Sequence, residues 1–186
     1  MRVKLAIILC ITIILCGCGK SADSLKEGME LRRQILESSG CSFHSTVTAD
    51  YGEKIYEFQM DCKTDKEGSL QFTVTSPDTI SGITGKSDNE GGAITFDDKV
   101  LAFQTLADGQ VTPVTAPWLM MKTLRSGYIR DAAAIEGGYE VTIDDTYKED
   151  ALRLIISVVG DKPASAEIYW QGRRILTVAV ENFVFL

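Results

Sequence analysis

Apolar and polar residues alternate along most of the chain after Leu36, in short segments that end at Gly, Asp, Asn or Pro. Such alternation is typical of strands that bury one face of a sheet. The pattern predicts about nine or ten antiparallel strands joined mostly by tight turns. The predicted strands span residues 41–50, 53–62, 69–76, 79–84, 93–96, 100–105, 139–143, 152–159, 164–170 and 175–184, and residues 85–92 are expected to form a polar loop.

The segment from Thr115 to Ile129 does not alternate, and it predicts a buried helix with Pro117 near its start and Gly127 near its end. Its large apolar residues are Trp118, Leu119, Met120, Met121 and Leu124. A helix that is apolar on nearly every side is a buried helix. Strands precede and follow it in the sequence, so they must curve over it. The predicted fold class is therefore α+β, a curved antiparallel β-sheet that holds the apolar helix in its concave face.

A second helix is predicted at residues 25–38, near the start of the chain. Ser24 and Glu27 have the spacing of a capping box, with Ser24 as the N-cap. Gly40 follows the expected end of the helix. Its expected apolar stripe consists of Leu25, Met29, Arg32, Ile35 and Leu36. A helix with one apolar face should cover part of the sheet.

The first residues resemble the signal peptide of a bacterial lipoprotein. A short basic start is followed by an apolar run at residues 5–15, which is too short to span a bilayer. The run ends in Leu15-Cys16-Gly17-Cys18, similar to the lipobox in which a Leu and two small residues precede the lipidated Cys. We therefore predict a signal peptide at 1–17, diacylation of Cys18, a lipidated tether at 18–23 and a single domain at 24–186. An uncleaved anchor or a misread cytosolic start is the alternative.

Lipid attachment at Cys18 would place the protein outside the cytoplasm, anchored to the bacterial membrane. Several acyl chains on one residue give a stable anchor. Loss of Arg2 and Lys4 lowers the number of basic residues from 19 to 17 against 26 acidic ones, so the net charge becomes −9. An acidic domain does not bind nucleic acid or anionic lipid through charge. Any lipid binding by the domain would have to be apolar.

Two cysteines, Cys41 and Cys62, remain once the signal peptide and the lipidated residue are set aside. An even number of cysteines outside the cytoplasm favours a disulfide. If Tyr51-Gly52 is a two-residue hairpin loop, Cys41 faces Cys62 directly across the hairpin, with their Cα atoms about 4.5 Å apart. A longer loop would shift this register, and two free buried thiols are the alternative.

The sequence offers few residues for catalysis or metal binding. His44 is the single histidine, so a zinc site built on two or more histidines is excluded, and a Ser-His-Asp triad would have to use it. The hairpin places His44 on the polar face of its strand. The pairs Asp97-Asp98 and Asp144-Asp145 lie in predicted turns, where Asp bonds to nearby backbone. We predict a protein that is not an enzyme, with no metal site and no cofactor.

Several short segments resemble the lipoprotein-carrier superfamily of LolA and LolB. SPDTISG at residues 76–82 is similar to its Pro-containing strand turn, and ITFDDKV at residues 94–100 to its Asp-Gly hairpin, with Asp98 in place of the Gly. The helix at residues 117–124 follows where that superfamily inserts its cavity-filling helices. The size, anchor and order of elements are also similar to those of small clostridial germination lipoproteins. The resemblance implies a half-open barrel whose concave face is covered by helices and admits an acyl chain.

Two non-catalytic functions are compatible with this fold. In the first, the concave face binds an apolar ligand, such as an acyl chain, or a lipidated protein. The residues expected to line that cavity are Phe72, Val74, Trp118, Met120, Met121, Leu124, Val141 and Leu154. In the second, these side chains fill the concave face, and the protein docks another envelope or spore protein as a structural or regulatory lipoprotein. A homodimer is a further alternative.

Overall fold

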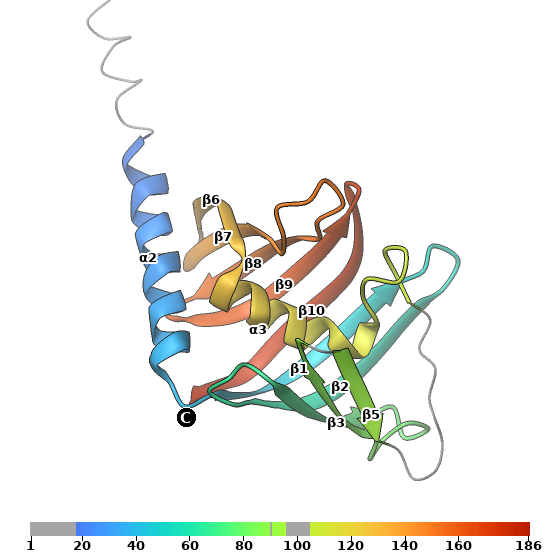
Figure 1. Cartoon of the computed structure of the whole chain (residues 1–186). Coiled ribbons are helices and arrows are strands. Elements are labelled where there is room, and N and C mark those ends of the chain that lie inside the picture. Colours follow the sequence, from blue (N-terminus) through green and yellow to red (C-terminus); the bar gives the residue numbers. More distant parts are fainter. Residues whose placement is uncertain (1–17, 90, 96–104) are drawn as a thin grey trace, which may run out of the picture.

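The computed structural model describes residues 18–89, 91–95 and 105–186 of the chain. Within these residues, ten strands form one antiparallel sheet in the spatial order β5-β4-β3-β2-β1-β10-β9-β8-β7-β6 (Figure 1). The strands are β1 (Cys41–Asp50), β2 (Ile55–Thr64), β3 (Leu70–Ser76), β4 (Thr84–Asp88), β5 (Gly91–Thr95), β6 (Tyr128–Ile135), β7 (Gly138–Asp144), β8 (Arg153–Val159), β9 (Lys162–Trp170) and β10 (Arg173–Phe185). Each half of the sheet is a meander, and the pairing of β1 with β10 joins the halves.

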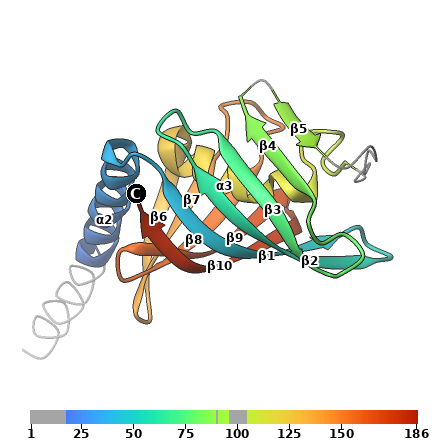
Figure 2. The same ribbon diagram turned by 90° about the horizontal axis from the view of Figure 1, so that it is seen from below.

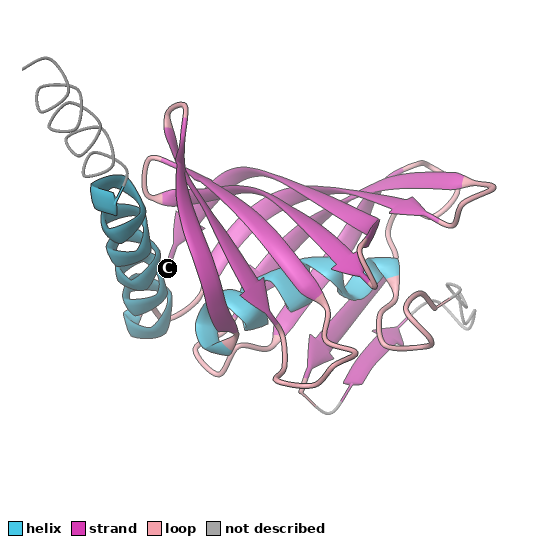
Figure 3. Ribbon diagram, turned by 90° about the horizontal axis from the view of Figure 1, so that it is seen from above, coloured by secondary structure: helices cyan, strands magenta, loops and turns pink. Residues whose placement is uncertain are grey.

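The sheet curves around the helix α3 (Ala116–Ser126), which lies across its concave face (Figure 3). Strand β1 buries every second residue from Cys41 to Ala49, so one of its faces points into the core. Strands β7, β8 and β9 add further buried residues to the same hydrophobic cluster. The predicted α+β fold class, with a curved antiparallel sheet and an apolar helix in its concave face, is confirmed.

Helix α3 is shorter than the predicted helix. A 3-10 turn, η1 (Pro113–Thr115), leads into it, and Gly127 ends it in an extended conformation. A Cβ atom at Gly127 would lie 2.6 Å from the Cγ2 atoms of both Ile143 and Thr123. Such a distance is closer than side chains tolerate, so only glycine lets the chain pass here. The residues that follow begin strand β6.

The N-terminal helix, α2 (Cys18–Glu37), begins earlier than predicted. Ser24 is buried inside the helix, so the predicted capping box is wrong. Residues 18–23 are helical rather than an extended tether. Because a helix rises only about 1.5 Å per residue, Cys18 stays close to the folded domain. No helix within the described residues is long and apolar enough to cross a membrane.

The face of α2 that packs on β6 and β7 also differs from the prediction. Ile35 is the one member of the predicted stripe that is fully buried. The buried face consists of Ser24, Gly28, Leu31 and Ile35, whereas Leu25, Met29 and Leu36 are exposed. A Cβ at Gly28 would lie 3.2 Å from Cγ2 of Val141, so small residues allow α2 to approach the sheet closely. Figure 2 shows α2 at the end of the molecule, with one side against the sheet.

The predicted disulfide is wrong, because the first hairpin has a different register. Asp50 pairs with Ile55, and Cys62 therefore lies opposite Phe43 instead of Cys41. In this register Cys41 and Cys62 are diagonal neighbours across the hairpin, and the Cα atoms of such a pair are about 7–8 Å apart. This Cα distance is beyond the reach of a disulfide. Both thiols are free and buried. The register slips by two residues, so each side chain keeps its predicted face.

A four-residue loop at residues 51–54 causes this shift. The backbone N–H of Gly52 donates to Oδ1 of Asp50 at 2.6 Å, and the N–H of Tyr51 donates to the carbonyl of Lys54 at 3.0 Å. Gly52 has a φ of 90°, which glycine adopts readily. Asp50 thus favours its own local turn over the tight two-residue loop.

Other predicted segments also differ from the structure. Within the segment predicted as a polar loop, residues 85–88 belong to β4 and residues 91–92 to β5. Residues 79–84 are mainly turn rather than strand, although Ile83 is buried. Strand β6 was not predicted. The signal peptide, the pair Asp97-Asp98 and most of the strand predicted at 100–105 lie outside the described residues.

Candidate functional site at the concave face

Seven of the eight residues predicted to line a cavity are core residues. They are Phe72, Val74, Met120, Met121, Leu124, Val141 and Leu154, none more than 3% exposed. They belong to one hydrophobic cluster with the rest of α3 and the inner face of the sheet. These side chains therefore pack against one another and fill the concave face.

Trp118, the eighth residue, is only partly buried, and it borders a surface hollow of about 410 Å³ at the start of α3. Nζ of Lys122 lies 4.9 Å from the centre of its ring, within cation–π distance. The other residues around the hollow are mainly polar: Ser87, Asp88, Asn89, Gly109, Gln110, Thr112, Val114 and Thr115. We call this feature the rim hollow. Among the described residues, the Oγ of Ser87 is buried there without a hydrogen-bond partner.

Helix α3 is held in place at its C-terminal end by two arginines. The side chain of Arg32 on α2 donates to the carbonyls of Leu124, Thr123 and Gly127, at 2.7, 3.3 and 2.8 Å. Burial lowers the pKa of Arg32 because it disfavours the charged form. Arg125 donates to the carbonyl of Lys66 at 2.7 Å. These contacts tie α3 to α2 and to the turn before β3.

The acidic and histidine candidates have structural partners. Nδ1 of His44 lies 2.8 Å from Oδ1 of Asp61, directly across the hairpin. Asp144 is buried and forms ion pairs with Arg130 at 3.3 Å and Arg153 at 3.0 Å. No group of three His, Cys, Asp or Glu residues within the described ranges could hold a metal ion.

The carboxyl group of Asp145 forms a hydrogen bond within its own loop. Its Oδ1 accepts a hydrogen bond from the N–H of Leu152 at 2.8 Å, which closes the loop between β7 and β8. Burial raises the pKa of Asp145. This carboxyl group therefore stabilises the loop rather than facing a ligand.

The two thiols are buried and poorly reactive. Burial raises the pKa of Cys41, and it raises the pKa of Cys62 to about 12. A nucleophilic cysteine needs a lowered pKa and access to solvent. Sγ of Cys62 instead lies 3.5 Å from Oγ of Ser45 inside the core. These cysteines pack as small apolar residues.

Sequence reasoning identified Trp118 but not its polar surroundings. Lys122 lies four residues further along α3 and could have been placed beside Trp118 from helical spacing. Ser87 and Gln110 come from separate loops and strands whose proximity depends on the tertiary fold. Arg32 was assigned to the apolar stripe of α2, and its contacts with α3 were not predicted.

No protein-family model matches the chain, and no curated protein has a matching sequence. Solved structures similar to it include an uncharacterised conserved protein from Thermus thermophilus, with a TM-score of 0.47, 12% identity and coverage of 88% of each chain. A LolA superfamily protein from Nitrosomonas europaea has a TM-score of 0.47 and 8% identity, over 86% of this chain and 93% of its own. The lipoprotein LppX from Mycobacterium tuberculosis has a TM-score of 0.40 and 9% identity, over 87% and 93%. One of these similar structures is described as a LolA superfamily protein, the group that the sequence resembles.

Proposed function

We propose that this protein is a membrane-anchored extracytoplasmic lipoprotein that works without catalysis, as a docking module for another envelope protein. The observation that supports this proposal is the filled concave face. Met120, Met121 and Leu124 of α3 lie against the sheet in one continuous core. An acyl chain could enter that space only if these side chains left it.

The chemistry of the rim hollow also favours a protein partner over an acyl chain. Its volume of about 410 Å³ is within the range of ligand pockets, but such pockets are mostly apolar. An acyl chain placed against the exposed Asn89 and Gln110 would remove their polar groups from water without replacing their hydrogen bonds, which is unfavourable. A peptide segment supplies both polar groups and apolar side chains, and Trp118 offers it an aromatic contact.

Binding of an apolar ligand is the second candidate function. The two methionines of α3 support it, because their long flexible side chains can repack around a guest molecule. This function requires α3 to move away from the sheet. The contacts of Arg32 with the end of α3 oppose such a movement.

The two functions are distinguished by extraction and mass spectrometry of the purified mature chain carrying Cys18→Ser, which removes the covalent lipid. The docking function predicts no apolar molecule in stoichiometric amount. A stoichiometric fatty acid or phospholipid would overturn the filled-core argument and support the carrier function.

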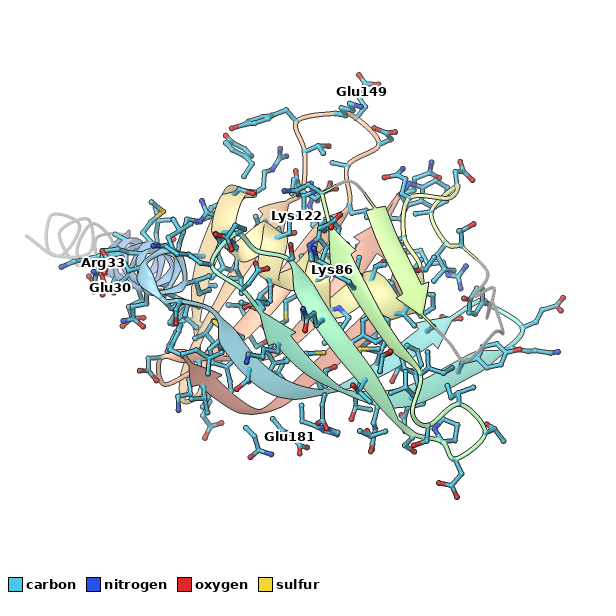
Figure 4. All side chains as sticks on the ribbon, turned by 60° about the horizontal axis from the view of Figure 1, so that its bottom comes forward. Glu30, Arg33, Lys86, Lys122, Glu149 and Glu181 are labelled. Atoms are coloured by element: carbon cyan, nitrogen blue, oxygen red, sulfur yellow. The ribbon has the colours of Figure 1, made fainter. Side chains whose placement is uncertain are left out.

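A photo-cross-linking residue at Gln110 tests docking directly in cells. Gln110 is exposed at the rim hollow, and Glu181 is a matched exposed control on the outer side of β10 (Figure 4). We expect one discrete protein adduct from position 110 and none from position 181. The adduct should be lost when Lys122→Glu changes the charge beside Trp118. Adducts of equal yield from both positions would refute docking at the rim hollow.

A further inference from the structure

Helix α2 carries an exposed apolar stripe that the fold does not cover. Leu25, Met29 and Leu36 are 44%, 50% and 46% exposed. With 3.6 residues per turn, these positions, together with Ala22 and position 18, fall within about 60° of one another around the helix. The stripe therefore runs along one side of α2 from the predicted lipid attachment site to its last turn.

Charged residues are distributed unevenly around this stripe. Lys26 and Arg33 lie next to it on one border, and Arg33 forms ion pairs with Glu30 and Glu37. The acidic residues Asp23, Glu27 and Glu30 lie further round the helix. Figure 4 shows Glu30 and Arg33 on the side of α2 that points away from the sheet. Apolar residues bordered by basic ones, with acidic residues further away, are typical of helices that lie in the membrane interface.

We propose that α2 lies along the membrane surface, with Leu25, Met29 and Leu36 inserted at the boundary between headgroups and acyl chains. This inference rests on the proposed lipid anchor at Cys18. Because the helix already begins at that residue, no extended tether separates the anchor from the stripe. The acyl chains would hold the start of the helix at the headgroups, and the stripe runs down the same side.

A second copy of the chain fits this surface less well. A coiled-coil seam needs apolar residues at successive turns, but the turn between Met29 and Leu36 carries Arg32 and Arg33 instead. The seam would be interrupted there. Three half-exposed side chains also offer much less than the roughly 800 Å² per partner that a stable protein interface buries. The lipid bilayer is therefore the better occupant.

Fluorescent labelling of single cysteines tests this inference. Met29→Cys on the stripe and Asp23→Cys on the far side of α2 are labelled with an environment-sensitive dye in the lipidated protein. The native thiols Cys41 and Cys62 are buried and do not compete for the dye. The protein is reconstituted in phosphatidylcholine vesicles that contain nitroxide-labelled lipid. Asp23 is closer to the anchor than Met29 along the helix. If proximity to the anchor alone determined quenching, the dye at position 23 would therefore be quenched more strongly than the dye at position 29.

We expect blue-shifted emission and several-fold stronger nitroxide quenching at position 29 than at position 23. Equal quenching at the two positions would overturn the inference. Energy transfer between labelled copies without lipid quenching at position 29 would overturn it in favour of self-association. A soluble protein that never binds vesicles would instead mean that the anchor is wrong. A polyhistidine tag in place of Cys18, on nickel-chelating vesicles, then tests the stripe on its own with the same two positions.

Discussion

Replacing Arg32 by Met should weaken the contact between α2 and α3. The Nε of Arg32 donates to the carbonyl of Leu124, and a terminal nitrogen donates to the carbonyl of Gly127. The last carbonyls of a helix lack donors within the helix, and a cation favours the negative end of the helix dipole. Met keeps most of the length and the apolar stem of Arg, so the substitution removes mainly the charge and its hydrogen bonds.

The expected loss follows from opposing contributions. A hydrogen bond from a charged donor contributes about 1.5–3 kcal/mol, and a partly buried cation at a helix C-terminus contributes up to about 2 kcal/mol. These two figures describe the same contacts and do not add. The burial that lowers the pKa of Arg32 is a cost that Met avoids. We therefore expect a net destabilisation of about 2 kcal/mol, which lowers the Tm of a chain of this length by roughly 4–8 °C.

Arg33→Met is the matched control, on the same helix and with the same change of residue. Arg33 is exposed and, among the residues that the structure describes, pairs with Glu30 and Glu37 of its own helix; pairs of this kind contribute little to stability. Thermal and urea unfolding, followed by far-UV circular dichroism, should show a clearly lower midpoint for Arg32→Met alone. Equal midpoints for the two variants would refute the role assigned to Arg32.

Four further outcomes are expected. Denatured but unreduced protein should be alkylated at both Cys41 and Cys62, whereas a disulfide would leave both unmodified. Burial raises the pKa of Tyr139 to about 12, above its usual value near 10, so its contribution to stability is complete below about pH 10 and is lost as the pH rises through about 12. In Tyr139→Phe, the urea midpoint should no longer fall between about pH 10 and 12 because of this group. The same fall in the variant as in the unmodified protein would contradict the role of Tyr139. Cys18→Ala should leave the protein unlipidated, as a soluble or precursor form, and a variant that still fractionates as a mature lipoprotein would exclude the anchor. Met121→Asp should unfold the domain because it places a charge in the core, and a folded variant that carries a ligand would contradict the filled concave face.

The accuracy of the sequence predictions depended on how each strand is buried. The strands predicted at 152–159, 164–170 and 175–184 lie within two residues of β8, β9 and β10. These strands alternate because one face packs on the core. Strand β6 was missed because it lies at the edge of the sheet, buries mainly Ala132, and is rich in a residue with low strand preference.

At the concave face, the sequence predicted the helix but not whether its side chains fill the space. Its apolar helix could be predicted, because only a buried helix carries so many large apolar residues. Whether these residues fill the space or line it depends on the curvature of the sheet. The two halves of that sheet are joined by the long-range pairing of β1 with β10, which no local pattern reports. Met and Leu residues suit a lining and a filling equally well.

In helix α2, apolar residues predicted to pack on the sheet instead face away from it. Leu25, Met29 and Leu36, three members of the predicted stripe, share one exposed side of the helix. The sheet, however, is covered by another face, where a Cβ at Gly28 would lie 3.2 Å from Cγ2 of Val141, tighter than an ordinary contact. The sequence places an apolar stripe on the helix but does not state which surface, if any, covers it. With the lipid anchor proposed at Cys18, the first residue of this helix, we infer that the covering surface is the membrane.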